Sequence, residues 1–128
     1  SYSRNRGAEL ARGELLLFVD ADVCVHPDVL TRVTQAFRED AGASAVIGRY
    51  DDAPPARGLV SQYRNLLRHH FWHRVPGAVD HFWAGCGAVR RDAFMAAGMF
   101  NEWHFRSPQL EDELLGRQLR ALGRTILL

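Results

Sequence analysis

The feature that most constrains the fold is Leu15–Val19, a run of apolar residues without a polar break that ends at Asp20-Ala21-Asp22. A short apolar run bounded by polar residues is typical of a strand buried on both faces, as in the parallel sheet of an α/β protein. Ligands of such sheets bind beyond the carboxyl ends of the strands. The run therefore predicts a central buried strand, with Asp20 and Asp22 at a ligand-binding edge.

These two aspartates also suggest a cation. Carboxylates this close repel each other unless a positive charge lies between them. A hard divalent metal with oxygen ligands, Mg²⁺ or Mn²⁺, meets that need and commonly also holds a substrate diphosphate. Aspartate is equally common in the turn that leaves a strand. Asp20 and Asp22 alone do not decide between a metal site and a turn.

Composition limits the class of protein. A chain of 128 residues, 47% hydrophobic and 24% charged, fits one globular domain at most. Its net charge of +1 creates no overall field that would recruit nucleic acid or an anionic membrane. Cys24 and Cys86 form neither a disulfide framework nor a metal-ligand pattern, so a reducing cytoplasmic setting is expected. No apolar run approaches the roughly 18 residues of a membrane span.

Periodicity predicts alternating helices and strands. Helices are expected over 4–12, 27–38, 59–74, 90–98 and 110–122, and strands over 15–19, 45–50, 79–89 and 125–128. In the third helix, Val60, Tyr63, Leu66, Leu67 and Phe71 share an apolar side. His69, His70 and His73 on this helix have the spacing of a metal pair, but no third ligand accompanies them. A solvated or groove-lining face is therefore the favoured interpretation of the histidines.

Two further motifs are ambiguous by themselves. Gly85-Cys86-Gly87 permits the close approach of backbone to a ligand, or marks a bulge or turn. Glu111-Asp112-Glu113 crowds the first turn of the last helix, where acids offset the helix macrodipole by about 0.3–1 kcal/mol each. Taken alone, the acids favour this stabilising role over a catalytic one.

Two segments near the start of the chain resemble the inverting family-2 glycosyltransferases of GT-A fold. Arg4–Gly7 is similar to the family's Arg-Asn-x-Gly helix. Ala11–Asp22, with Pro27 after it, is similar to the family's Ala-x-Gly, strand, Asp-x-Asp and Pro signature. Both lie in the order that the family shows.

Two later segments extend the resemblance. Gly85–Arg91 followed by Gly98–Glu102 looks like the family's acceptor-side strand, Arg-Arg helix and Gly-x-Phe-x-Glu loop. Glu111-Asp112, with Arg117 and Gly123 behind it, is similar to the Glu-Asp motif. Each match is modest, but their order and spacing are specific and cover nearly the whole chain.

The resemblance implies a GT-A, Rossmann-like three-layer α/β sandwich and a partial catalytic domain over residues 1–128. The strands with which the family begins, and the histidine often found after the Glu-Asp helix, have no counterpart. The chain also begins without methionine and ends within the apolar run Thr125–Leu128. We therefore expect a central catalytic piece of a longer enzyme that lacks the N-terminal nucleotide-binding strands.

The resemblance also implies site roles. A hexosyltransferase-like enzyme would move a sugar from a nucleotide-diphosphate sugar to a saccharide or lipid-linked acceptor, with inversion, and would bind no nucleic acid. Membrane association of the parent protein, at the inner face, is left open. Asp112 would be the general base, and Asp22 with Asp20 would hold Mg²⁺ or Mn²⁺. Donor-side residues would be Arg4, Asn5, Asp20, Ala21 and Asp22, and acceptor-side residues Gly85, Cys86, Trp83 and Glu111.

Alternatives differ in their chemistry. Trp83 or Trp103 would stack on a sugar ring or belong to the core. Haloacid-dehalogenase-type phosphatases also end a strand in Asp-x-Asp, but they usually place lysine on the phosphoryl group. All sixteen basic residues here are arginine. A non-catalytic sugar-binding or interaction module of the same descent is the third interpretation.

Overall fold

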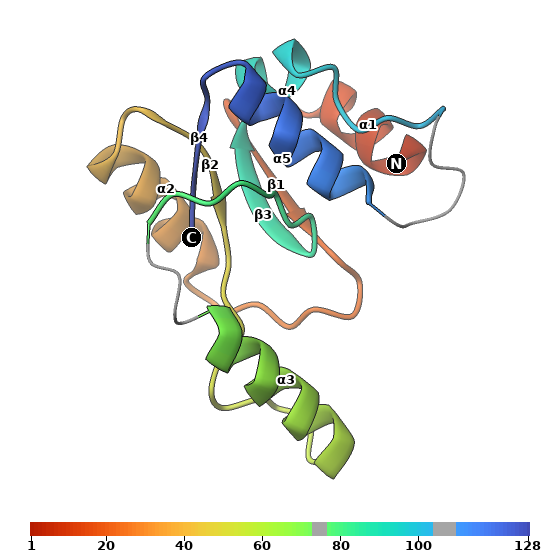
Figure 1. The fold of residues 1–128 in the computed structure, drawn as a ribbon, viewed down its shortest axis with the longest axis vertical. Helices are drawn as coiled ribbons and strands as arrows, with labels where there is room; N and C mark the ends of the chain where they lie inside the picture. Colours follow the sequence, from red (N-terminus) through yellow and green to blue (C-terminus); the bar gives the residue numbers. More distant parts are fainter. Residues whose placement is uncertain (73–76, 104–109) are drawn as a thin grey trace.

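The computed structural model describes residues 1–72, 77–103 and 110–128, in which helices and strands alternate along the chain (Figure 1). The strands are β1 (Leu15–Val19), β2 (Ala43–Ile47), β3 (Cys86–Arg90) and β4 (Thr125–Leu127). The helices are α1 (Tyr2–Leu10), α2 (Val29–Glu39), α3 (Leu59–Trp72), α4 (Arg91–Ala96) and α5 (Glu111–Ala121). Each predicted element is therefore present, with shifted ends.

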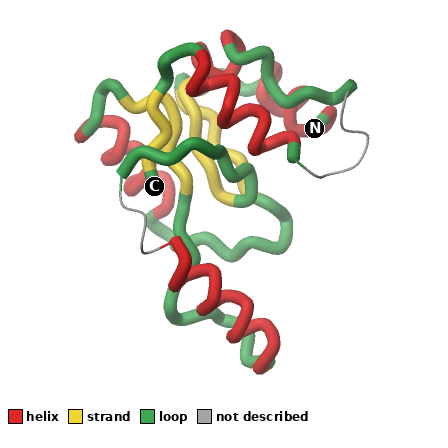
Figure 2. Tube along the Cα trace, viewed as in Figure 1, coloured by secondary structure: helices red, strands yellow, loops and turns green. Residues whose placement is uncertain are grey.

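The sheet lies between two helical layers, so the three-layer α/β arrangement is confirmed (Figures 1 and 2). Side chains alternate across the sheet because successive strand residues point to opposite faces. On one face, Leu15 and Leu17 pack with Phe37 of α2. On the other face, Leu16 joins a larger core that includes Leu115 and Leu119 of α5.

The position predicted for the first strand is wrong. The strand order is β1-β3-β2-β4, so β1 is at an edge of this sheet rather than at its centre. It pairs antiparallel with β3, and of its residues only Leu16 is fully buried. An apolar run reports burial but carries no information about strand direction or order, which long-range pairing decides.

The sheet topology gathers three chain segments at one end of the sheet. Strands β1, β2 and β4 run one way and β3 runs the other. The carboxyl ends of β1 and β2 consequently flank the amino end of β3. The Asp20 N–H donates to the Gly85 carbonyl at 3.0 Å, and the Gly48 N–H donates to the Cys86 carbonyl at 2.8 Å. This end of the sheet carries most of the predicted site residues.

Helix α3 is the exception to the layered packing. It projects away from the sheet and its flanking helices (Figure 1), and none of its residues is fully buried. The helix is present as predicted, but its apolar side faces solvent rather than a core.

Candidate functional site

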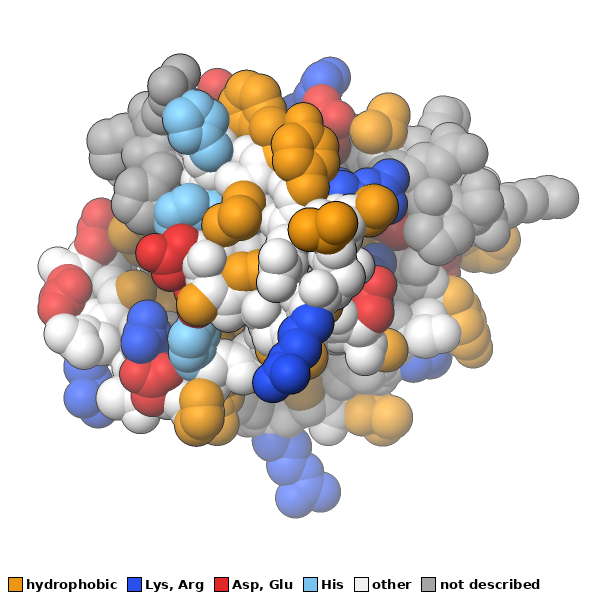
Figure 3. Space-filling model, turned by 90° about the horizontal axis from the view of Figure 1, so that it is seen from below, with side chains coloured by type: hydrophobic (Ala, Val, Ile, Leu, Met, Phe, Trp, Pro, Cys, Tyr) orange, Lys and Arg blue, Asp and Glu red, His pale blue; other side chains and the backbone are white. Residues whose placement is uncertain are grey.

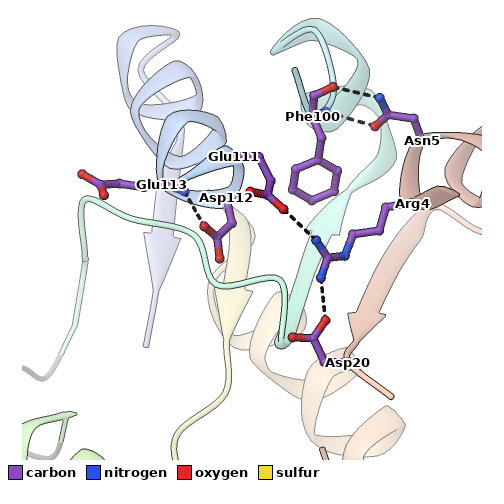
Figure 4. A network of polar contacts seen from close by, with 7 residues as sticks. All are labelled: Arg4, Asn5, Asp20, Phe100, Glu111, Asp112 and Glu113. Atoms are coloured by element: carbon purple, nitrogen blue, oxygen red, sulfur yellow. Dashed lines mark hydrogen bonds and ion pairs between the residues drawn. The ribbon is translucent and has the colours of Figure 1, made fainter. Parts of the chain in front are cut away.

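A single arginine joins the two acidic motifs (Figure 4). Arg4 of α1 donates from Nη2 to Oδ1 of Asp20 at 2.5 Å and from Nη1 to Oε1 of Glu111 at 3.3 Å. Its guanidinium carbon also lies 5.7 Å from the centroid of the Phe100 ring, within cation–π range. The end of β1 and the start of α5 are thus held beside each other, although they are far apart in the sequence.

Glu111 depends on pairing of this kind. Its side chain is only 4% exposed, and a carboxylate removed from water is tolerated when it is paired and hydrogen-bonded. Arg4 supplies the opposite charge. The acceptor-side role of Glu111 stays a prediction, and the structure adds an ion pair that fixes the beginning of α5.

Asp112 follows Glu111 in the first turn of α5 and is partly exposed. Its Oδ1 accepts a hydrogen bond from the Glu113 backbone N–H at 2.9 Å. This bond satisfies one of the N–H groups that a helix start leaves without an intrahelical partner. Within residues 1–72, 77–103 and 110–128, Oδ2 of Asp112 has no hydrogen-bond partner. The carboxylate therefore keeps an oxygen that can accept a proton.

Asn5, predicted as a donor-side residue, is held inside the protein by both ends of its amide. Asn5 is only 2% exposed. Its Nδ2 donates to the Phe100 carbonyl at 2.8 Å, and its Oδ1 accepts from the Phe100 N–H at 3.1 Å (Figure 4). Both ends of the amide are therefore used to tie α1 to the segment after α4. Arg4 and Asn5 therefore both anchor α1, Arg4 through ion pairs with Asp20 and Glu111 and Asn5 through its amide.

A cleft of about 1020 Å³ opens beside the end of β1. Asp20 and Asp22 line it, together with the segment after β1, the segment after β2, Cys86 and the polar side of α3. Trp83 also lines the cleft and stacks on Tyr50, with ring centroids 5.0 Å apart and 25° between the planes. An acidic strand end and an aromatic wall thus share one concave surface.

The remaining predicted residues lie outside this lining. Ala21 is exposed between the two aspartates, and Trp103 is 88% exposed on a different segment. Gly85 is buried, and a Cβ atom there would come within 2.4 Å of the Trp83 indole. At Gly87 a Cβ atom would lie 2.4 Å from the Trp83 carbonyl. Close packing of Trp83 therefore explains the Gly-x-Gly motif without a bound phosphate.

Two titratable groups of the cleft have shifted pKa values. Burial raises the pKa of the Cys86 thiol, because the thiolate is poorly solvated there. The Ala53 backbone N–H, followed by the His26 ring 2.5 Å away, lowers the pKa of Asp51. His26 and Asp51 connect the segment after β1 with the segment after β2. This contact could not be predicted from the sequence, because no spacing rule relates the two residues.

The acidic strand end fits a metal held jointly with a ligand. Among the described residues, no group of three or more His, Cys, Asp or Glu side chains is placed to hold a metal ion. Mg²⁺ needs fewer protein ligands, because it is usually held by one or two carboxylates plus substrate phosphates and water. Asp22 meets that requirement, while Asp20 is already paired with Arg4. His69 lies 2.7 Å from the Tyr50 carbonyl and His73 is outside the described residues.

Comparison with known proteins decides the class. The family model described as glycosyl transferase family 2 matches residues 1–98. The chain is a family-2 glycosyltransferase. As a member of this family it has the GT-A fold, present here as a partial domain. The match includes Arg4, Asp20, Asp22 and Cys86 and ends before α5.

The Arg4–Glu111 ion pair consequently joins the Glu-Asp motif to the matched part of this glycosyltransferase, in addition to the core packing of Leu115 and Leu119. No curated protein and no solved structure matches the chain. None of the helices in the described part of the chain has the length and apolar character needed to cross a membrane.

Proposed function

We propose that this family-2 glycosyltransferase moves a hexosyl group from a nucleotide-diphosphate sugar to an acceptor hydroxyl with inversion. The observation that carries the proposal is the Arg4 contact between Asp20 and Glu111. It sets the acidic end of β1 and the acidic start of α5 on the same side of the molecule. In this proposal one group of carboxylates serves the donor and the other serves the acceptor, so both must lie near one reacting centre.

The donor side of the proposal is the cleft beside β1. Asp22, exposed in the cleft and not paired with Arg4, is the carboxylate best placed to share a Mg²⁺ or Mn²⁺ ion with the diphosphate. Such a metal neutralises the negative charge that develops on the leaving diphosphate. Asp20 is fixed by Arg4 and is better suited to hydrogen bonding with the nucleotide than to sole coordination of the cation.

The acceptor side of the proposal is the start of α5. The acceptor oxygen forms a bond to the anomeric carbon as the bond from that carbon to the diphosphate oxygen breaks on the opposite face. Asp112 accepts the hydroxyl proton through Oδ2 while Oδ1 remains bonded to the Glu113 N–H. Glu111 is a positioning residue in this proposal, because its carboxylate is buried against Arg4. Trp83, stacked on Tyr50, offers an aromatic surface for a sugar ring.

The test is to replace Asp112 with asparagine, which keeps the shape and removes the ability to take up a proton. Loss of a general base lowers turnover by about 10²–10⁴-fold, equivalent to roughly 3–5 kcal/mol of barrier. Donor affinity, measured by calorimetry with Mn²⁺ present, should be unchanged. Glu113→Gln is the matched control, because Glu113 is paired outward with Arg117 at 2.5 Å and should retain turnover.

The outcome also separates the competing interpretations. Near-normal turnover in Asp112→Asn would return Asp112 to a role at the helix start. Binding of nucleotide sugars without any transfer or hydrolysis, under conditions that keep the protein folded, would favour the non-catalytic module.

A further inference from the structure

Helix α3 is amphipathic, but its polar side faces the protein. Asn65 donates from Nδ2 to the Asp51 carbonyl at 2.5 Å, and His69 contacts the Tyr50 carbonyl. Arg68 lies over the Tyr50 ring, 5.4 Å from its centroid. These contacts attach the polar side of α3 to the segment after β2. The helix is therefore held in place while its other side remains uncovered.

The uncovered side, here called the outer apolar face, is large. Exposed fractions on it run from 40% for Leu67 to 85% for Leu59, with Tyr63 at 66% and Phe71 at 62%. Contiguous apolar surfaces of this kind mark a site of interaction. The face consists of Leu59, Val60, Tyr63, Leu66, Leu67 and Phe71, with exposed His70 among them by helical spacing.

The charges around this face indicate what covers it. Arg64, which also lines the cleft, is exposed at the border of the outer apolar face by helical spacing, and exposed Arg57 precedes the helix. No Asp or Glu occurs within Leu59–Trp72. Viewed from the end where α3 projects, hydrophobic side chains lie together with arginines, histidines and some acidic side chains that come from outside α3 (Figure 3). Aromatic and aliphatic side chains with arginine at their border are typical of a helix that lies in a membrane interface.

We propose that the outer apolar face of α3 docks on an anionic lipid bilayer. At 14 residues, α3 is about 21 Å long and too short to span a hydrocarbon core of about 30 Å. It would lie in the plane of the interface, with Phe71 and Leu67 below the headgroups and Arg57 and Arg64 against lipid phosphates. This inference stands independently of the sugar transfer proposed for the cleft.

Charge distinguishes a bilayer from a second copy of the chain. If two copies packed through their outer apolar faces, arginines would lie at the border on both sides, and α3 would supply no acidic side chain to pair with them. Anionic headgroups supply the missing countercharge, and each arginine near such a surface contributes about 1 kcal/mol, or roughly fivefold in binding. The arrangement therefore favours lipid as the occupant.

The experiment is flotation of the full chain with vesicles of phosphatidylcholine containing about one third phosphatidylglycerol, and with vesicles of phosphatidylcholine alone. We expect binding to the mixed vesicles that weakens as salt is raised. Val60→Glu with Phe71→Glu should lower binding at least about tenfold, because two apolar anchors become anions. Arg57→Gln with Arg64→Gln should lower binding to the anionic vesicles by about 25-fold.

Leu30→Glu is the matched control, because Leu30 is an apolar residue of α2 that is 67% exposed and distant in sequence from α3. It should float like the unaltered chain, and circular dichroism should show all variants folded. Equal flotation of Val60→Glu/Phe71→Glu and Leu30→Glu would overturn the proposal. A dimer in sedimentation that Val60→Glu/Phe71→Glu converts to monomer, without vesicle binding, would overturn it in favour of a second copy.

Discussion

Asn5 provides the sharpest test of how the site is supported. Its amide makes two hydrogen bonds to the backbone of Phe100, at 2.8 Å and 3.1 Å, in an environment that is 2% exposed. Phe100 in turn lies in an aromatic cluster with Phe18 and Phe94, with ring centroids 5.2 Å and 5.3 Å away. Asn5 thus connects α1, which carries Arg4, to the aromatic core on the α5 side of the sheet.

The expected cost of Asn5→Ala follows from these contacts. Each hydrogen bond contributes about 0.5–1.5 kcal/mol net, and a buried backbone group left without a partner costs about 1–3 kcal/mol. Some relaxation and water entry will offset part of the sum. We therefore expect a loss of about 2–4 kcal/mol in the free energy of unfolding, measured by urea denaturation with an unchanged m-value.

Asn5→Asp adds a dependence on pH. The ionised carboxylate cannot donate to the Phe100 carbonyl, whereas the protonated carboxyl can. The native state of this variant therefore binds more protons than the unfolded state, so its stability falls as pH rises. Relative to the unaltered chain, the loss in the free energy of unfolding should be small near pH 4 and largest near neutral pH, since an ordinary aspartate titrates at about 3.9.

Asn65→Ala is the matched control, because Asn65 makes one hydrogen bond at a half-buried position where water can replace it. It should cost less than about 1 kcal/mol. A cost below about 1 kcal/mol for Asn5→Ala would refute the anchoring role. So would a stability difference between Asn5→Asp and the unaltered chain that stays constant from acid to neutral pH.

Two further predictions concern the cleft. Asp22→Ala should weaken the binding of a nucleotide diphosphate by at least about tenfold in Mn²⁺, and the remaining affinity should not respond to a chelator. The unaltered protein should lose affinity in EDTA. Unchanged affinity of the unaltered protein in EDTA would argue for a metal-free site. Exposed Cys24 should react with a thiol reagent at neutral pH well before half-buried Cys86, whose pKa is raised by burial. Because the thiolate is the nucleophile, labelling of Cys86 should become fast only above the usual pH range for thiols, and equal rates in the folded protein would contradict this.

Local pattern was sufficient to predict most of the elements. The apolar run at Leu15–Val19, the helical spacing after Pro27 and the Leu-rich last helix all appear as elements of the predicted type. The spacing of apolar residues within a short window of sequence shows whether a helix or a strand can bury them on one side. This information is local, so it can be read from the sequence alone. The order and spacing of the motifs likewise predicted the glycosyltransferase family that the comparison confirms.

Only the tertiary structure decided how these elements are placed. It put β1 at a sheet edge beside an antiparallel β3, joined Asp20 to Glu111 through Arg4, and buried Asn5 against Phe100. It also turned the apolar side of α3 toward solvent. Pairing between residues distant in sequence depends on competition among many long-range contacts, and spacing along one chain does not record which contact wins. The sequence determines which side chains are charged or apolar, and the tertiary structure determines which of them come into contact.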